Sequence, residues 1–198
     1  GLDPDDEALT ELREGLDGDL LLITGDAGRE ADVIDTANRL SEWLDGAPLT
    51  CLVNNAGIAD PYARPLEDLS LADFQSWIDA SLTAAFLCSR SCLPFLRRGE
   101  GGSIVNISST RAVMSEPDCF GYAAAKGGLD ALTHAMAVSL GPDIRVNAIR
   151  PGWIETRNWQ KQPNREQVEH REQDKAQHPA GRVGNPEDIA QTVDWLIG

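Results

Sequence analysis

The fold is decided by the stretch that begins Ser103-Ile-Val-Asn-Ile-Ser-Ser109 and ends Tyr122-Ala-Ala-Ala-Lys126. The first segment is apolar and rich in β-branched residues, which predicts a buried strand. The second opens a run of strong helix formers with apolar residues at helical spacing, so we expect a helix that continues to Leu140. In parallel α/β sheets ligands bind where strands end, which is where Ser109 stands.

Three side chains of this stretch can perform acid–base chemistry: Ser109, Tyr122 and Lys126. Tyr122 and Lys126 are i and i+4 neighbours on one helix face. A phenol is almost wholly protonated at neutral pH, and a nearby ammonium group favours its phenolate form. If Ser109 donates a hydrogen bond to a substrate oxygen, Tyr122 can exchange a proton with that oxygen and interconvert a carbonyl and an alcohol. Taken alone, however, such a pair is more often a partly buried ring beside a solvated charge.

Length and composition are those expected of one soluble domain: 198 residues, 41% of them hydrophobic and 25% charged. The formal net charge of −15 argues against binding nucleic acid or anionic membrane surfaces. The chain has no run of about 18 apolar residues, so we expect no membrane span. The first residues, Gly1-Leu-Asp-Pro-Asp-Asp-Glu7, lack the basic and apolar parts of a signal peptide, and we expect a cytoplasmic protein.

Neither the cysteines nor the histidines indicate a metal site or a disulfide framework. His170 and His178 lie among Gln, Glu and Arg without a tight ligand cluster, which favours a solvated helix face. The four cysteines show no CxxC spacing, so buried reduced thiols fit them better (Cys51, Cys88, Cys92 and Cys119).

The first part of the chain contains a turn that could be mistaken for a phosphate loop. Gly25 and Gly28 follow a predicted strand, but the pyrophosphate loop of a dinucleotide fold needs further glycines, as in GxGxxG. Asp26 would also place a carboxylate where phosphates bind, so we interpret the segment as an ordinary turn. The periodicity of this part predicts two helices and two strands (helices Asp5–Leu16 and Ala31–Leu44, strands Asp19–Thr24 and Leu49–Val53).

The second of these strands runs into Asn54-Asn-Ala-Gly57. Its amides and its glycine suit contact between a ligand and the backbone, although in isolation an ordinary Asn-rich turn explains these residues better. Ser70 is then expected to cap a long helix that Pro94 and Gly99 end, with an apolar stripe wide enough to contact a second subunit. The remaining pattern predicts a strand, a polar mobile flap and a last helix capped by Asn185 (Asp143–Arg150, Arg157–Gly181 and Ile189–Ile197).

Four motifs follow one another along the chain: Asn54-Asn-Ala-Gly57, Ser109 thirteen residues before Tyr122, Tyr122-x-x-x-Lys126, and Pro151-Gly152-x-Ile154-x-Thr156. Each is weak alone, but together, in this order and spacing, they resemble the short-chain dehydrogenase/reductase family. The resemblance covers essentially the whole chain. It implies a single α/β domain over residues 1–198, with a Rossmann-like, doubly wound parallel sheet that is incomplete here and a substrate lid at about 157–181.

The resemblance also implies roles for individual residues. Tyr122 matches the family's acid/base, Lys126 the residue that favours its phenolate form and holds the nicotinamide ribose, and Ser109 the hydroxyl that orients the substrate carbonyl. Trp153 and Trp159 would stand at the entrance of the lid. Further positions match contacts to NAD or NADP near the adenine, in the Asn-Asn-Ala-Gly motif and near the nicotinamide carboxamide (Asp26 and Ala27; Asn54, Ala56 and Gly57; Pro151, Gly152, Ile154 and Thr156). No metal is implied.

Two departures from the family matter. Ser81 stands where the family usually has a catalytic Asn; its hydroxyl could hold water, but the Asn-mediated proton relay is in doubt. In addition, nothing before Asp19 matches the family's first two strands or its TGxxxGxG loop, and nothing after Gly198 matches its final strand. The strands Asp19–Thr24 and Leu49–Val53 would then have no common neighbour, so we expect a broken sheet and a chain that is a piece of a larger one.

The function implied by the resemblance is that of an NAD(P)-dependent oxidoreductase that interconverts a ketone or aldehyde and an alcohol of a small molecule. The choice between NAD and NADP stays open. The alternative is a non-catalytic scaffold or binding protein without a functional phosphate loop, but a binding protein has no chemical need for Ser109, Tyr122 and Lys126 together. The helices over 70–96 and 122–140 match those that form the family's homodimer or homotetramer.

Overall fold

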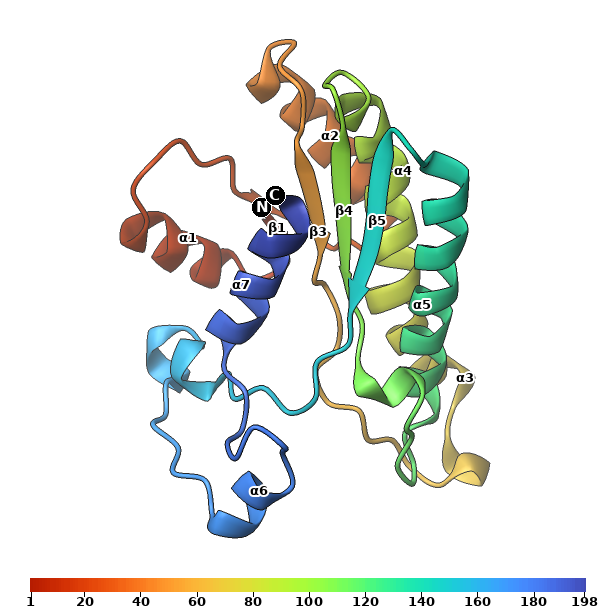
Figure 1. Ribbon diagram of the computed structural model, residues 1–198, viewed down its shortest axis with the longest axis vertical. Coiled ribbons are helices and arrows are strands. Elements are labelled where there is room, and N and C mark those ends of the chain that lie inside the picture. The colour runs from red at the N-terminus through yellow and green to blue at the C-terminus, as the bar shows by residue number, and fades with distance from the viewer.

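A parallel sheet of three strands forms the centre of the molecule. A computed structural model describes residues 1–198, and its central sheet has the order β3-β4-β5. The strands are β3 (Cys51–Asn54), β4 (Gly102–Ile107) and β5 (Ile144–Ile149). β4 lies between the other two and is buried from Gly102 to Asn106, as its β-branched sequence predicts. Because parallel strands end on one side, the segments after all three leave the sheet at the same edge (Figure 1).

A second, two-stranded parallel sheet pairs β1 (Leu2–Asp3) with β2 (Ile23–Thr24). The sequence pattern predicted no strand at Leu2–Asp3, because a strand of two residues is too short to show any periodicity. The strand predicted for Asp19–Thr24 is likewise limited to its last two residues, which are the ones that have a partner. β2 and β3 do belong to different sheets, as the broken order implied.

Helices lie on both sides of the central sheet. Figure 1 shows α4 and α5 beside it on one side and α1 and α7 on the other. α2 packs on α4, and the α/β class with parallel strands predicted from the sequence is confirmed. The helices are α1 (Asp6–Gly15), α2 (Glu30–Leu44), α3 (Leu71–Trp77), α4 (Ala84–Leu96), α5 (Phe120–Leu140), α6 (Glu172–Ala176) and α7 (Pro186–Ile197).

The core is formed where β4 and β5 meet the ends of α4 and α5. Its fully buried members are Leu96, Ile104, Ile144 and Val146. Leu49 and Leu52 from the β3 region and Leu140 from α5 pack against this cluster at partly buried positions. This core packs the first residues of β4 and β5 against the last turns of α4 and α5, at the end of the sheet away from Ser109.

The long helix predicted after Ser70 is interrupted. Ser70 caps it as expected, because its hydroxyl accepts from the N–H of Asp73 at 3.0 Å. Between α3 and α4, however, Ile78–Thr83 forms a π-helix, a feature that often marks functional sites. The helix then passes through Pro94 and ends at Leu96, which is the predicted bound of the helix over 70–96 and lies between Pro94 and Gly99.

The flap over residues 157–181 contains little regular structure beyond α6. It includes two short 3₁₀ turns, Arg157–Trp159 and Gln162–Asn164. The last helix, α7, begins with the predicted cap, since Asn185 Oδ1 accepts from the N–H of Asp188 at 3.0 Å. None of the helices combines the length and the apolar character needed to cross a bilayer.

Candidate active site

Lys126 is the buried charge at the carboxyl edge of the sheet. Only 5% of its surface is exposed, and its Nζ donates to the carbonyl of Ile107, the last residue of β4, at 2.8 Å. Burial lowers the pKa of Lys126 from 10.5 to about 8, while the charge of Asp130 acts in the opposite direction. Nζ also lies 5.7 Å from the centre of the Tyr122 ring. The predicted Tyr–Lys pair is therefore a real contact in the structure, with the lysine beneath the ring rather than in solvent.

Ser109 lies just beyond the end of β4. It is 7% exposed, and its Oγ accepts a hydrogen bond from the backbone N–H of Arg111 at 3.1 Å. Since a hydroxyl both donates and accepts, this contact leaves the Ser109 proton free for another oxygen. The neighbouring Ser108 Oγ donates to the carbonyl of Lys126 at 3.3 Å, which ties the strand end to the first turns of α5. Ser109 and Lys126 are thus held on adjacent segments of one edge.

Asn54 is fixed inside the sheet. The pairing of β3 with β4 places it opposite Asn106, and its Nδ2 donates to Asn106 Oδ1 at 2.8 Å and to Ser89 Oγ at 3.1 Å. Asn106 in turn donates to Thr133 Oγ1 of α5 at 2.8 Å. Because the Nδ2 group of Asn54 is committed to this network, Asn54 can offer a cofactor only its Oδ1 and its backbone. Asn106 was not singled out in the sequence, although it is a polar residue in the middle of an apolar strand.

Gly57 allows the backbone to approach Ser81 and Lys126 closely. A Cβ at this position would lie 2.9 Å from Ser81 Oγ and 3.5 Å from Lys126 Nζ. Gly57 and its neighbour Ala56 are exposed, so their backbone is accessible to a ligand. Ser81, from the π-helix, is 2% exposed and its Oγ has no hydrogen-bond partner. The residue at the usual Asn position therefore does border the candidate site.

The turn after β2 is held together by a hydrogen bond within it. Asp26 Oδ1 accepts from the N–H of Gly28 at 2.8 Å, and a Cβ on Gly28 would lie 2.8 Å from the backbone oxygen of Asp79. Gly28 thus permits the close approach of this turn to the π-helix, which agrees with our interpretation that it is not a phosphate loop. Asp26 is exposed at the surface, whereas Ala27 is buried.

The segment from Pro151 to Thr156 connects the sheet to the flap. The carbonyl of Pro151 accepts from the N–H of Thr110 at 3.0 Å, next to Ser109. Ile154 pairs with Gly184 in an isolated bridge, while Gly152 and Thr156 are exposed. The segment with the predicted nicotinamide contacts is therefore hydrogen-bonded to the loop that carries Ser109.

Trp153 joins the flap to this segment. The ring of His170 meets it edge-on, with centroids 5.1 Å apart, and His170 Nε2 lies 3.4 Å from Glu155 Oε2. The prediction of a solvated helix face is wrong for His170, whose side chain is 15% exposed and lies outside α6. Two hydrogen-bonded contacts with Arg157 hold the pKa of Glu155 down at about 2, so this carboxylate is ionised beside His170 at neutral pH.

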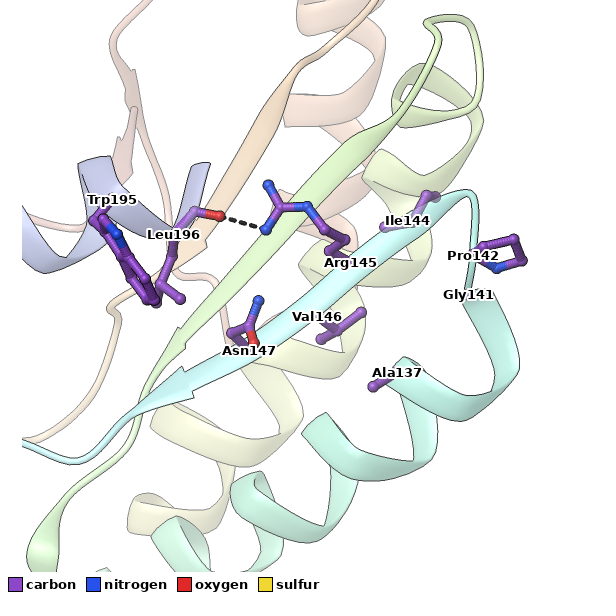
Figure 2. A pocket seen from close by; sticks show the side chains of 9 residues that line it. All are labelled: Ala137, Gly141, Pro142, Ile144, Arg145, Val146, Asn147, Trp195 and Leu196. Carbon is purple, nitrogen blue, oxygen red and sulfur yellow. Dashed lines mark hydrogen bonds between the residues drawn. The ribbon is translucent and has the colours of Figure 1, made fainter. Parts of the chain in front are cut away.

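Two cavities lie away from Ser109, Tyr122 and Lys126. The first, of about 510 Å³, is bordered by β5 and by Trp195 and Leu196 of α7 (Figure 2). Arg145 crosses it and donates to the carbonyls of Leu196 at 2.6 Å and Ile197 at 2.8 Å. The second, of about 310 Å³, lies at the base of the flap beside Glu155 and His170.

Comparison with known proteins decides the ancestry of the chain. Residues 2–198 match the family model described as "Enoyl-(Acyl carrier protein) reductase". An "Uncharacterized oxidoreductase" of Thermotoga maritima is 43% identical over 97% of this chain and 75% of its own length. This chain is a member of the short-chain dehydrogenase/reductase family. The predicted family resemblance is thereby confirmed.

Two further relatives place it among oxidoreductases of this family. The "Cis-4-hydroxycyclohexanecarboxylate dehydrogenase" of Sinomonas cyclohexanicum is 34% identical over 94% of this chain and 76% of its own length. The crystal structure of a short chain dehydrogenase from Bacillus anthracis superposes with a TM-score of 0.82 at 28% identity, covering 100% of this chain and 77% of that one. The Rossmann-like fold and a general oxidoreductase function follow from these similarities.

Proposed function

We propose that the protein is an NAD(P)-dependent dehydrogenase/reductase that interconverts a ketone or aldehyde and an alcohol. The observation that carries the proposal is the buried Lys126 beneath the Tyr122 ring, at the strand edge where Ser109 also lies. A buried ammonium group has no structural benefit that a neutral side chain would lack, so its electrostatic effect on Tyr122 explains its presence best.

The residues divide the proton chemistry among them. The free Ser109 proton donates to the substrate oxygen and orients it. Tyr122 gives its proton to that oxygen during reduction and takes it back during oxidation. The positive charge of Lys126 favours the phenolate that forms on Tyr122 when the proton is transferred. The backbone carbonyl of Ile107 holds Lys126 in place throughout.

The residues around Gly57 fit a nicotinamide cofactor. Ala56 and Gly57 are exposed, and the absence of a side chain at Gly57 lets its backbone lie close to Lys126. We assign Lys126 and Gly57 to the nicotinamide ribose and the segment Pro151–Thr156, through Ile154 and Thr156, to the carboxamide. Asp26 and Ala27 remain our assignment for the adenine. When bound, the cofactor supplies or accepts the hydride.

The substrate class is a small molecule with a secondary alcohol or the matching carbonyl. The name of the Sinomonas relative describes a cyclic secondary alcohol that carries a carboxylate. The side chains that border the opening here are partly apolar, since Met114, Trp153 and Trp159 are exposed near the loop and the flap. A panel should therefore include cyclic and linear secondary alcohols, with and without a carboxylate, and the matching ketones.

The test follows nicotinamide absorbance with NADH and NADPH, using the full-length protein that contains residues 1–198. We expect turnover of at least one carbonyl compound and a loss of roughly 10³-fold or more in kcat for Tyr122→Phe. Calorimetry should show that Tyr122→Phe still binds the cofactor. Cofactor binding with unchanged turnover in Tyr122→Phe would refute the assigned role, and a protein that binds no nicotinamide cofactor would support the non-catalytic alternative.

A further inference from the structure

Two loops frame the candidate site from the same edge of the sheet. Residues 55–65 follow β3 and residues 108–119 follow β4, and Figure 1 shows both descending from the ends of these neighbouring strands. Their backbones meet once, where the N–H of Ala63 donates to the carbonyl of Asp118 at 2.7 Å. Neither loop has regular structure over most of its length, so their relative position depends on contacts between their side chains.

Glu116 provides that contact by binding both loops. One carboxylate oxygen accepts from Tyr62 Oη at 2.6 Å, and the other forms an ion pair with Arg111. Arg111 also donates to the carbonyl of Met114 at 3.2 Å, which closes its own loop. A short hydrogen bond from a hydroxyl to a carboxylate is among the stronger kinds in proteins. Consistent with it, the bond lowers the pKa of Glu116 and raises the pKa of Tyr62.

The contacts of Glu116 with Tyr62 and Arg111 lie close along the chain to Ser109 and to the start of α5, which carries Tyr122. The backbone N–H of Arg111 is the group that donates to Ser109 Oγ at 3.1 Å, so the position of Arg111 sets the direction of the Ser109 proton. On the other side, Cys119 is 2% exposed and directly precedes α5, three residues before Tyr122. Glu116 precedes Cys119 by three residues, and the charges of Arg111 and Glu116 act in opposite directions on the pKa of the Cys119 thiol.

We propose that Tyr62, Glu116 and Arg111 form a positioning clamp that holds the two loops together over the site and thereby fixes Ser109 for the substrate. Tyr62 is 54% exposed and the Glu116 side chain 39%, so the clamp contributes little to global stability. Its effect is on local order, because opening it frees a loop whose remaining hydrogen bond with residues 55–65 is the one from Ala63 to Asp118. The consequence for catalysis rests on the proposed function, whereas the closure of the loops does not.

Cys119 reports loop closure without any substrate. In the full-length protein, iodoacetamide labelling followed by peptide mass spectrometry measures the rate at each cysteine. Cys119 is only 2% exposed and burial raises the pKa of its thiol, so we expect it to react slowly while the loop is closed. For Tyr62→Phe and for Glu116→Gln we expect labelling of Cys119 to rise about fivefold. The rates at Cys51, Cys88 and Cys92, on other elements, should not change.

Glu30→Gln is the matched control, because it removes a surface ion pair with Arg90 that joins α2 to α4 far along the chain from both loops. It should leave labelling of Cys119 unchanged. Thermal melts should place all three variants within a few degrees of the parent protein, which excludes global unfolding as the cause. An unchanged Cys119 rate in both clamp variants would overturn the proposal, as would an equal rise in the control.

Kinetics test the catalytic consequence with the best carbonyl substrate from the panel. Tyr62→Phe and Glu116→Gln should each raise the KM for that substrate about fivefold with a smaller change in kcat and no change in cofactor affinity. The double variant should be no worse than Glu116→Gln alone, because Tyr62 acts only through its bond to Glu116, whereas Glu116 also pairs with Arg111. Additive effects, or an unchanged KM, would show that the clamp does not position the substrate side. If the protein turns over no substrate, the labelling result still decides whether the clamp exists.

Discussion

Lys126 illustrates how one residue combines a structural cost with a chemical use. Its ammonium group is buried with a single backbone carbonyl as its hydrogen-bond acceptor, which is a costly environment for a charge. The spacing from Tyr122 to Lys126 could be read from the sequence, but a solvated lysine has the same spacing. Only the packing of α5 against the end of β4 makes the position distinctive.

The cost at Lys126 predicts a pH-dependent stability difference. The folded pKa of about 8 lies below the ordinary value of 10.5, so between these values the unfolded chain holds a proton that the folded chain has lost. Lys126 therefore lowers the free energy of unfolding most below pH 8, and this penalty decreases as the pH rises toward 10.5. Lys126→Met should gain up to roughly 3 kcal/mol in unfolding free energy at neutral pH and much less above pH 10. Urea unfolding at several pH values measures this; an equal gain at every pH would contradict it.

Removing the Ser81 hydroxyl should stabilise the protein, whereas removing a hydrogen-bonded buried hydroxyl normally destabilises it. Its buried hydroxyl has no partner, so Ser81→Ala should raise the free energy of unfolding by about 1 kcal/mol. Ser89→Ala is the control, because Ser89 Oγ accepts from Asn54 and its loss should destabilise by about 1 kcal/mol. Urea midpoints compare the two variants, and a Ser81→Ala variant as unstable as Ser89→Ala would refute the prediction.

At the scale of elements, helix ends were easier to predict than helix interiors. The caps at Ser70 and Asn185 rely on side chains that bond to the next turn, which is local information. The π-helix at Ile78–Thr83 and the passage of α4 through Pro94 have no comparable local signal. The π-helix and α3 before it pack on α5, where Trp77 lies against Gly121, and such packing is not visible in the local sequence.

The contact between α3 and α5 depends on a glycine. A Cβ at Gly121 would lie 2.5 Å from the Trp77 ring, so Gly121→Ala should destabilise the protein by roughly 1–3 kcal/mol. On the same helix, a Cβ at Gly127 would meet nothing closer than 3.7 Å, and Gly127→Ala should be neutral or stabilising by about 0.5–1 kcal/mol. Thermal and urea unfolding test the pair. Equal destabilisation by both variants would mean that backbone freedom, not the Trp77 contact, matters.

At the scale of the whole molecule, the sequence predicts a homodimer or homotetramer through the helices over 70–96 and 122–140. In the isolated chain Leu71 and Val138 are 78% and 72% exposed, and Phe86 of α4 is 46% exposed. Large apolar side chains on the surface of these helices are consistent with a partner there.

The oligomer prediction is tested by Val138→Arg and Leu71→Arg in the full-length protein. We expect both to shift the assembly toward monomer in sedimentation experiments, because a charge would be buried at the interface. Leu12→Arg, at a 43% exposed position of α1, is the control and should leave the assembly unchanged. A parent protein that sediments as a monomer, or variants with unchanged assembly, would contradict the prediction.

The sequence by itself determined the α/β class, the helix caps, the family and the identity of Ser109, Tyr122 and Lys126 as candidates. These follow from periodicity and spacing, which are properties of neighbours along the chain. Tertiary structure alone decided that Asn54 is locked to Asn106, that Ser81 borders Gly57 and Lys126, that His170 packs on Trp153, and that Glu116 joins two loops. Each of these depends on strand register or on contacts between segments far apart in sequence. No local pattern encodes them, because the energy of such a contact exists only after the chain has brought the two segments together.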